Sequence, residues 1–240
     1  MRIARIDTAD GPRAVVADGD HWAGVVSPFD LTRTGQQYPR SAVLLAPIAP
    51  GAVVGVSHPT NPDGTERVQG WWKSPRTVCG PAATIRRARW SSATVAEGEL
   101  ALIIGTRATE LTADTALRHV LGYTAANDVT TTAPQQDSAF FAAKVGDNFT
   151  PLGPWIETEL PDPDTAVITV SVDGAPVQTS STATLPHSIT QILVALTRHV
   201  TLEPGDVVLT GSPNTAAELG AGQCVEITVE GIGTLRNTVS

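Results

Sequence analysis

Two glutamates, Glu97 and Glu99, stand two residues apart at the start of an apolar run that continues to Gly105. If this run forms a strand, the side-chain period of two places both carboxylates on one face. Two like charges held that close repel each other unless a cation or a shared proton lies between them. A divalent metal ion bound by hard oxygen ligands would meet that requirement. The alternative, for these two residues alone, is a solvated strand end.

Three more ionisable residues have types and surroundings that suit chemistry. Asp128 lies within a strand predicted over residues 123–132, where an acid among small and apolar residues is costly unless it is paired or bound to a metal. Lys144 follows a short apolar segment at residues 139–143. His58 ends a short buried strand, where it acts either as an acid–base group or as a hydrogen-bonded structural residue.

The bulk composition is that of an ordinary globular protein, with 41% hydrophobic and 17% charged residues among 240. The formal net charge of −8, without a basic patch, argues against a nucleic-acid partner. No stretch approaches the roughly 20 apolar residues of a membrane span. Met1 leads directly into strand-like sequence rather than a signal peptide, so we expect a cytoplasmic protein that does not enter membranes. Cys79 and Cys224 fit no disulfide framework or zinc motif and are expected to be buried free thiols.

The elements that must position these residues divide at a turn near residue 50. Residues 1–18 predict a hairpin, residues 18–40 predict a loop with little regular structure, and together with residues 43–47 they form a small N-terminal domain, 1–50. The larger domain, 51–240, is strand-rich, with helices predicted at residues 112–121 and 189–200. Because there is no alternation of strands with helices, an α+β, mainly β roll or sandwich is expected rather than a Rossmann fold.

A long polar loop at residues 60–69 is either a surface connector or a lid over a site. It is followed by Trp71 and Trp72, which point to opposite faces if they lie on a strand. One of the two then lines a pocket while the other packs in the core.

Several short motifs occur in one order along the chain. They are EGEL at 97–100, GYT at 122–124 with ND at 127–128, Lys144 with Asp147 and Phe149, PLGPW at 151–155, LEPGD at 202–206, TGSP at 210–213 and GIGTLRN at 231–237. Together they closely resemble the fumarylacetoacetate hydrolase family, over roughly residues 43–240. The N-terminal unit is similar to the small β-rich domain that precedes this fold in bacterial members.

The resemblance implies a mixed β-roll that forms a homodimer and holds Mg²⁺ or Mn²⁺ through three carboxylates. Those carboxylates map to Glu97, Glu99 and Asp128. Lys144 is then expected to order the site electrostatically. The backbone and hydroxyl of Thr210 and Gly211 are expected to receive a substrate carboxylate.

Family members hydrolyse, decarboxylate, isomerise or tautomerise 2-oxo acids and 1,3-diketones. The shared physics is a bidentate oxo acid that chelates the metal, which then stabilises a developing enolate as a Lewis acid. The ligand set fits this role, since hard oxygen ligands suit Mg²⁺ or Mn²⁺.

The sequence departs from the family where acid–base residues are expected. Members that cleave C–C bonds carry a His-x-x-Glu dyad on the lid, and those positions fall here on Asn61 and Gly64. His58 is close enough in the sequence to replace the missing base, with Asp63 or Glu66 orienting it, and the alternative is a structural hydrogen-bonded histidine.

A second departure follows Asp128, where an Arg-Asp-x-Gln segment keeps only Gln135. Losing a carboxylate-binding arginine suggests a substrate that is less charged than a simple dicarboxylate, or bound differently. Lys73 or Arg76 could supply the charge instead. A third departure places Leu-Pro-His at 185–187 in place of a more apolar pattern.

Three functions follow from these observations. The first is a metal-dependent hydrolase or lyase acting on a 2-oxo acid or β-diketone. The second keeps the metal but is an isomerase, tautomerase or cyclase on a bulkier enolisable substrate lined by Trp71 or Trp72. The third is a non-catalytic descendant of the fold, against which the intact metal ligands argue because unpaired buried carboxylates are costly.

Overall fold

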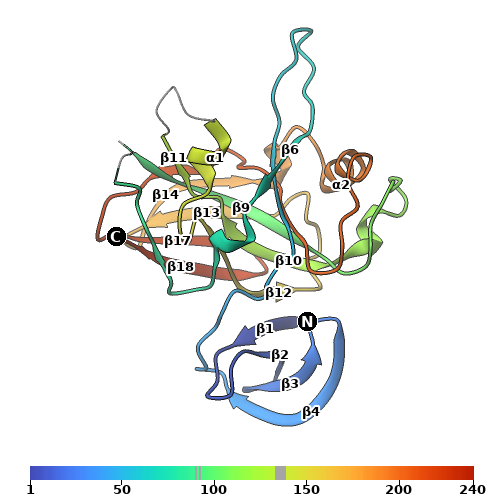
Figure 1. The fold of residues 1–240 in the computed structure, drawn as a ribbon, viewed down its shortest axis with the longest axis vertical. Helices are drawn as coiled ribbons and strands as arrows, with labels where there is room; N and C mark the ends of the chain where they lie inside the picture. Colours follow the sequence, from blue (N-terminus) through green and yellow to red (C-terminus); the bar gives the residue numbers. More distant parts are fainter. Residues whose placement is uncertain (90, 92, 133–138) are drawn as a thin grey trace.

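The computed structural model describes residues 1–89, 91, 93–132 and 139–240, and it is built mainly from strands in two curled sheets (Figure 1). This architecture confirms the α+β, mainly β fold class. No helix in the described part is long and apolar enough to cross a membrane.

Within the described residues, the larger sheet contains 13 strands. Its main path runs through β4 (Asp30–Pro39), β3 (His21–Ser27), β2 (Arg13–Asp18), β1 (Arg2–Ile6), β12 (Thr150–Glu157), β10 (Val120–Asn127), β9 (Thr94–Ile104), β15 (Val207–Leu209), β5 (Val53–Ser57) and β6 (Gln69–Lys73). Off this path, β11 (Thr130–Thr131) and β16 (Ala216–Glu218) pair with β9, and β7 (Val78–Cys79) pairs with β12.

The smaller sheet follows the order β14 (Ala175–Ser181), β13 (Val167–Val172), β17 (Cys224–Val229), β18 (Gly233–Val239) and β8 (Thr84–Ile85). The helical elements are α1 (Ala139–Lys144), α2 (Ile189–Thr197) and the 3-10 turns η1 (Pro75–Thr77), η2 (Ala116–His119) and η3 (Thr182–Thr184). Strands β13 and β14 form one antiparallel hairpin of this sheet, and β17 and β18 form another.

Strand β9 is the element on which the site depends. Its second half is completely buried between β10 and β15, while its first half pairs with β11, β16 and the end of β10. The apolar side chains from Leu100 to Ile104 therefore anchor the strand in the core, and burying each leucine or isoleucine among them stabilises the fold by roughly 1.5–3 kcal/mol. The two glutamates are carried at the end of this rigid support.

Gly98 lets the smaller sheet close against β9 on the face opposite the two glutamates. A Cβ atom at this position would lie 2.7 Å from Cγ2 of Val170 and 3.3 Å from Cγ2 of both Ile168 and Ile227. The two carboxylates therefore face the site on one side of β9. On the other side, the missing side chain of Gly98 leaves space into which the smaller sheet packs.

The N-terminal strands β1 to β4 form the lobe at the bottom of Figure 1, joined to the rest by antiparallel pairing of β1 with β12. The prediction of a loop over residues 18–40 is wrong, because β3 and β4 occupy this stretch. Among the described residues, strand β4 pairs with β3 alone and is exposed along nearly its whole length. Its sequence therefore lacks the alternation of apolar and polar residues that marks a half-buried strand. The domain boundary near residue 50 stays a prediction.

The helix predicted over residues 112–121 is also wrong. Only the short turn η2 is helical, and Val120 already belongs to β10, where it pairs with Ile104 of β9. The apolar spacing that suggested a helix is overridden by this strand pairing, which is a long-range constraint. By contrast, the helix predicted from residue 189 is confirmed as α2, and Ser188 caps it in a capping box with Gln191.

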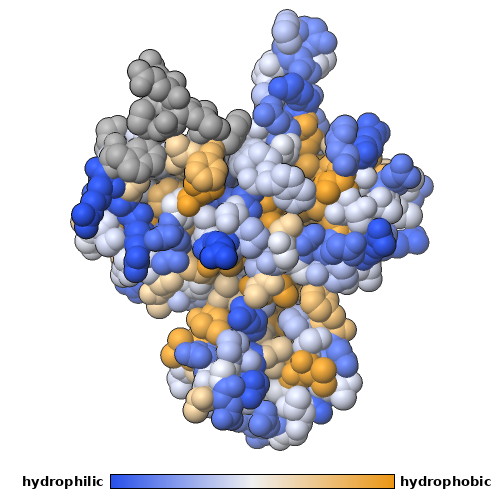
Figure 2. All heavy atoms as spheres, viewed as in Figure 1, coloured by the Kyte–Doolittle hydropathy of each residue, from blue (hydrophilic) through white to orange (hydrophobic). Residues whose placement is uncertain are grey.

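The polar loop at residues 60–69 forms the tip of a hairpin between β5 and β6 that projects from the body of the protein (Figure 1). Its surface is hydrophilic in Figure 2, as the sequence indicates. At its base, Trp72 is 60% exposed and Trp71 is half-buried. The expectation that one tryptophan packs in the core is therefore wrong, because β6 is an edge strand of the sheet. The free thiols Cys79 and Cys224 are half-buried rather than buried.

We predict that Gly98→Ala lowers the free energy of unfolding by about 1–3 kcal/mol, because the added methyl group must displace Val170 from the opposing sheet. Denaturant unfolding measures this change. Gly220→Ala is the matched control, since its nearest neighbour is the flexible end of Gln223 at 3.2 Å, and it should change stability by less than about 0.5 kcal/mol. Equal stability of the two variants would contradict the packing role of Gly98.

Candidate active site

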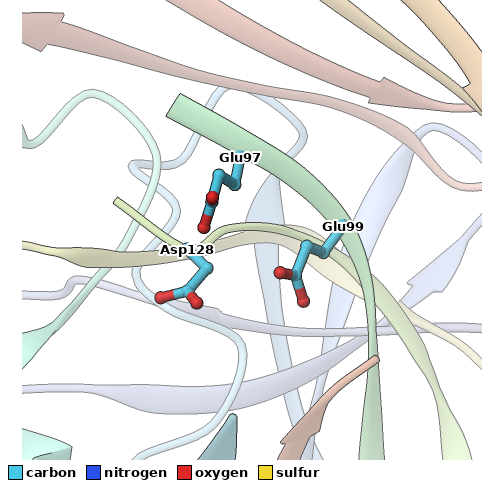
Figure 3. A group of neighbouring side chains, drawn as sticks. All are labelled: Glu97, Glu99 and Asp128. Carbon is cyan, nitrogen blue, oxygen red and sulfur yellow. The ribbon is translucent and has the colours of Figure 1, made fainter. Parts of the chain in front are cut away.

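Three carboxylates meet where β9 and the end of β10 lie side by side (Figure 3). Asn127 pairs with Gly98 in the ladder, so the next residue, Asp128, reaches the edge where Glu97 stands, and its N–H donates to the Glu97 carbonyl at 2.9 Å. One carboxylate oxygen from each of Glu97, Glu99 and Asp128 lies within 4.8 Å of the others. The structure thus brings together the three acids that the resemblance implied as metal ligands.

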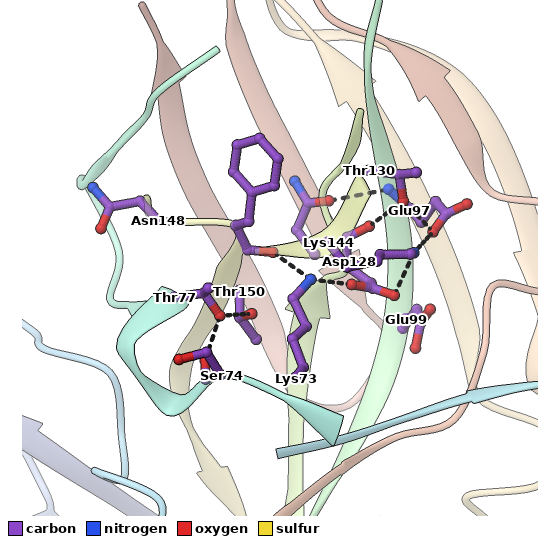
Figure 4. A network of polar contacts seen from close by, with 12 residues as sticks. Lys73, Ser74, Thr77, Glu97, Glu99, Asp128, Thr130, Lys144, Asn148 and Thr150 are labelled. Carbon is purple, nitrogen blue, oxygen red and sulfur yellow. Dashed lines mark hydrogen bonds and ion pairs between the residues drawn. The ribbon is translucent and has the colours of Figure 1, made fainter. Parts of the chain in front are cut away.

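Two lysines approach these carboxylates from other elements (Figure 4). Lys144, the last residue of α1, places Nζ 2.6 Å from Glu97 Oε2 and 2.6 Å from Asp128 Oδ2. Lys73, the last residue of β6, donates to Asp128 Oδ1 and, at 2.8 Å, to the carbonyl of Phe149. Asp128 is therefore held between two ammonium groups.

Burial and charge act in different directions on these groups. Burial raises the pKa of Glu99 well above its usual value, and the nearby charges of Asp128 and Glu97 raise it further. Burial would also raise the pKa of Asp128, but Lys73 and Lys144 outweigh it and hold that pKa below its usual value. Burial disfavours the charged form of Lys144, yet Asp128 and Glu97 raise its pKa overall. Asp128 is thus kept ionised while Glu99 lacks a comparable partner.

The donor set fits a divalent cation. When all three carboxylates are ionised, as metal ligands must be, they face two ammonium groups, which leaves an excess of negative charge. Glu99 accepts a hydrogen bond from the Gly211 N–H at 2.8 Å, and no lysine or arginine in the described residues forms an ion pair with it. A hard dication with oxygen ligands would balance this charge. The cluster could therefore hold a metal ion, whose identity the geometry leaves open.

Two neutral residues that sequence reasoning left out of the site position Glu97. The side-chain oxygen of Asn127 accepts from the Glu97 N–H at 3.0 Å, and the hydroxyl of Thr130 donates to Glu97 Oε2 at 2.8 Å. Asn127 is fully buried within an apolar strand, and that polar position beside Asp128 is the signal that could have revealed it.

The three acids and Lys144 line a cavity of about 500 Å³. Its other walls come from β5, the projecting hairpin, the loop after η3 and the turn after β15. Trp71 stands in the wall, with its ring centroid 5.6 Å from Nζ of Lys144. The volume is that of a site for a small molecule.

His58 lies in the cavity wall, but both of its ring nitrogens contact the protein. Nε2 lies 3.0 Å from the Thr210 carbonyl, and Nδ1 lies 3.0 Å from Nδ1 of His187. Because a carbonyl only accepts, Nε2 must carry the proton, and His187 donates to Nδ1 when both rings are neutral. The hydrogen-bond partner of His58 is therefore His187 rather than a carboxylate. Asp63 binds Thr65 in the hairpin turn, and Glu66 acts on His58 through its charge, which raises the histidine pKa.

The remaining predicted residues are placed as follows. Gly211 lines the cavity, whereas the Thr210 hydroxyl donates to the Leu100 carbonyl at 2.9 Å and is fully buried. Lys73 lies behind the carboxylates and is not among the cavity-lining residues. Gln135 lies outside the described residues. Substrate binding by these residues and by Trp71 stays a prediction.

Two family models match this chain. One, described as fumarylacetoacetate (FAA) hydrolase C-terminal, covers residues 52–240, and the other, described as Rv2993c-like, N-terminal, covers residues 1–47. Together they account for nearly the whole sequence, and they confirm the resemblance inferred from the motifs.

Solved structures with the same fold carry names from this group of enzymes. A protein named 5-carboxymethyl-2-hydroxymuconate delta-isomerase from Mycobacterium smegmatis is 35% identical, with a TM-score of 0.92 over 100% of this chain and 99% of its own. A protein named 2-hydroxyhepta-2,4-diene-1,7-dioate isomerase from Mycobacterium marinum is 34% identical, with a TM-score of 0.90 over 100% and 98%. The fumarylacetoacetate hydrolase of the psychrophilic Exiguobacterium antarcticum is 31% identical, with a TM-score of 0.89 over 100% and 99%.

We predict that His58 is the Nε2–H tautomer and that its pKa lies below 6.5, because burial disfavours the imidazolium and His187 adds to that effect. Long-range ¹⁵N NMR of the imidazoles measures both properties. In His187→Ala, water reaches Nδ1 and the pKa of His58 should rise toward 6.5. His199→Ala, at an exposed histidine just after α2 that does not line this cavity, is the control and should leave the pKa of His58 unchanged. An Nδ1–H tautomer, or titration above 6.5 in the wild type, would contradict the assignment.

Proposed function

We propose that this chain, which belongs to the fumarylacetoacetate hydrolase family, is a divalent-metal-dependent enzyme that stabilises the enolate of a 2-oxo acid or a β-diketone. The observation that carries the proposal is the triad of half-buried Glu97 and buried Glu99 and Asp128 in the wall of a small-molecule cavity, next to Lys144. The outcome proposed first is C–C bond hydrolysis or decarboxylation. The proposal retains Mg²⁺ or Mn²⁺, a small-molecule substrate and a homodimer as its expectations.

The triad supplies the ligands for the cation. When bound, a divalent ion would polarise the substrate carbonyl and offset the charge of the enolate. The Gly211 N–H fixes the orientation of Glu99, and Asn127 with Thr130 does the same for Glu97. Ligands held by neighbouring groups in this way keep their geometry without reorganisation during the reaction.

The lysines contribute a fixed electrostatic field. Lys73 is buried and bonded on two sides, so it keeps Asp128 ionised and immobile. Lys144 borders the cavity, and its positive charge lowers the energy of an anion that develops beside it. A charged group already in place is more effective than solvent, because no reorganisation accompanies the reaction.

Proton transfer by His58 requires one of its hydrogen bonds to open. Its Nε2–H is committed to Thr210, and its Nδ1 accepts from His187. A substrate proton can reach Nδ1 only when the loop that carries His187 moves away. Activation of a hydrolytic water by His58 thus depends on a rearrangement of that loop.

This restriction weighs against hydrolysis and supports a second function, an isomerase or tautomerase without C–C cleavage. Such a reaction needs enolate stabilisation and a proton transfer at carbon but, like decarboxylation, no activated water. Two of the similar structures are named as isomerases, which supports the same alternative. Breakdown of oxaloacetate or an acylpyruvate favours the first function, and tautomerisation without cleavage favours the second.

We predict that the protein with Mn²⁺ or Mg²⁺ catalyses exchange of the C3 hydrogens of a 2-oxo acid with deuterium from the solvent, measured by ¹H NMR. Enolisation is common to both functions, so this measurement tests them together. Glu99→Gln should slow the exchange by about 10²-fold or more, because a ligand to the charge-stabilising cation is lost. The exposed Glu230→Gln is the matched control and should exchange at the wild-type rate. Unchanged exchange in Glu99→Gln would contradict the proposal.

A further inference from the structure

The part of the cavity beyond the triad is built from uncharged residues and one acid. Val56, Leu185, Pro186 and Pro213 are apolar, and Ser57, Thr184, Ser212 and Asn214 are polar but neutral. His58 also lines this part, and burial lowers its pKa, which favours the neutral imidazole even though the charge of Glu66 acts in the opposite direction. The acid is Glu66, which the projecting hairpin brings to the cavity wall. A substrate bound to the triad by its oxo-acid end would extend its tail along these walls.

No unpaired cation borders this region within the described residues. Lys144 is the one lysine or arginine in the wall, and Glu97 and Asp128 already hold its ammonium group. Lys73 is buried behind the triad. Arg67, next to Glu66 on the hairpin, donates to Gln69 at 2.9 Å instead of lining the cavity.

The residues outside the described part of the chain add no cation. Positions 90, 92 and 133–138 contain no lysine, arginine or histidine in the sequence. The acids therefore outnumber the cations in the wall, where Glu66, Glu97, Glu99 and Asp128 face Lys144. Even with a divalent ion in place, the wall has no positive charge to spare for a second anionic group.

We infer that the site selects 2-oxo acids or acylpyruvates with a single carboxylate, at the oxo end, and an uncharged tail, and that Glu66 is the residue that rejects a second carboxylate. The inference rests on the proposed function and specifies its substrate class. A tail carboxylate would lose its hydration on entering the cavity and find Glu66 rather than a cation. A neutral aliphatic or aromatic tail meets Trp71, Leu185 and the prolines without that cost.

The test is a pair of ligands with the same carbon skeleton, 2-oxopentanoate and 2-oxoglutarate, which differ by a terminal methyl or carboxylate group. Their dissociation constants are measured by calorimetry on the full-length protein with Mn²⁺ present. We expect wild-type protein to bind 2-oxopentanoate about tenfold or more tightly than 2-oxoglutarate, which corresponds to one repulsive charge contact at short range. The gap should shrink as salt concentration rises.

Variants at residue 66 separate charge from hydrophobicity. Glu66→Gln should narrow the ratio of the two dissociation constants, and Glu66→Lys should narrow it further or reverse it. Because the ratio is compared between variants, the different hydrophobicity of the ligands cancels. Glu230→Lys makes the same charge change on an exposed turn away from the cavity and should leave the ratio at the wild-type value.

The outcomes distinguish the two levels of the proposal. Equal or tighter binding of 2-oxoglutarate by the wild type overturns the inference and leaves the proposed function standing, since it would show a cation from a source such as a second copy of the chain. A ratio that Glu66→Lys does not move overturns the role of Glu66. Absence of binding by both ligands in the presence of Mn²⁺ overturns the proposed function, and the inference with it.

Discussion

Mutual repulsion among buried carboxylates is the constraint around which this structure is arranged. Asp128 is almost inaccessible and lies between Lys73 and Lys144, and Glu99 is buried beside them with no ammonium partner among the described residues. Removing a lysine from Asp128 would leave buried negative charge uncompensated, which costs roughly 3–5 kcal/mol. The elements that carry these residues, β6, β9, β10 and α1, are therefore held in register by the charges as well as by the core.

In the proposed function, the part of the site that activates a substrate is separate from the part that selects it. The carboxylates and Lys73 lie on strands with a buried core behind them or at their ends, and Lys144 ends α1. The selecting residues lie on the projecting hairpin and on the loop before α2, which contribute Glu66 and Leu185 to the cavity. Such loops change without disturbing the sheet, so one rigid centre can serve different substrates.

Patterns of local origin predicted much of the fold and the centre of the site. The spacing of Glu97 and Glu99, the acid at Asp128 and the helix that begins at residue 189 each follow from a few neighbouring residues. The failures have long-range causes. Residues 112–121 become a turn and a strand because β9 requires a partner, and β4 is polar because nothing covers it. His187 was missed as the partner of His58 because 129 positions separate the two in the sequence.

The central claim is that the triad is a metal site, and a calorimetric titration with Mn²⁺ tests it most directly. The account predicts that wild-type protein binds Mn²⁺ and that Asp128→Asn and Glu99→Gln each weaken binding about tenfold or more. Asp114→Asn, the same change at an exposed acid, should bind as the wild type does. Oxalate, which resembles an enolate of a 2-oxo acid, should tighten the binding of Mn²⁺. Binding that is absent from the wild type, or unchanged in both triad variants, would contradict the account.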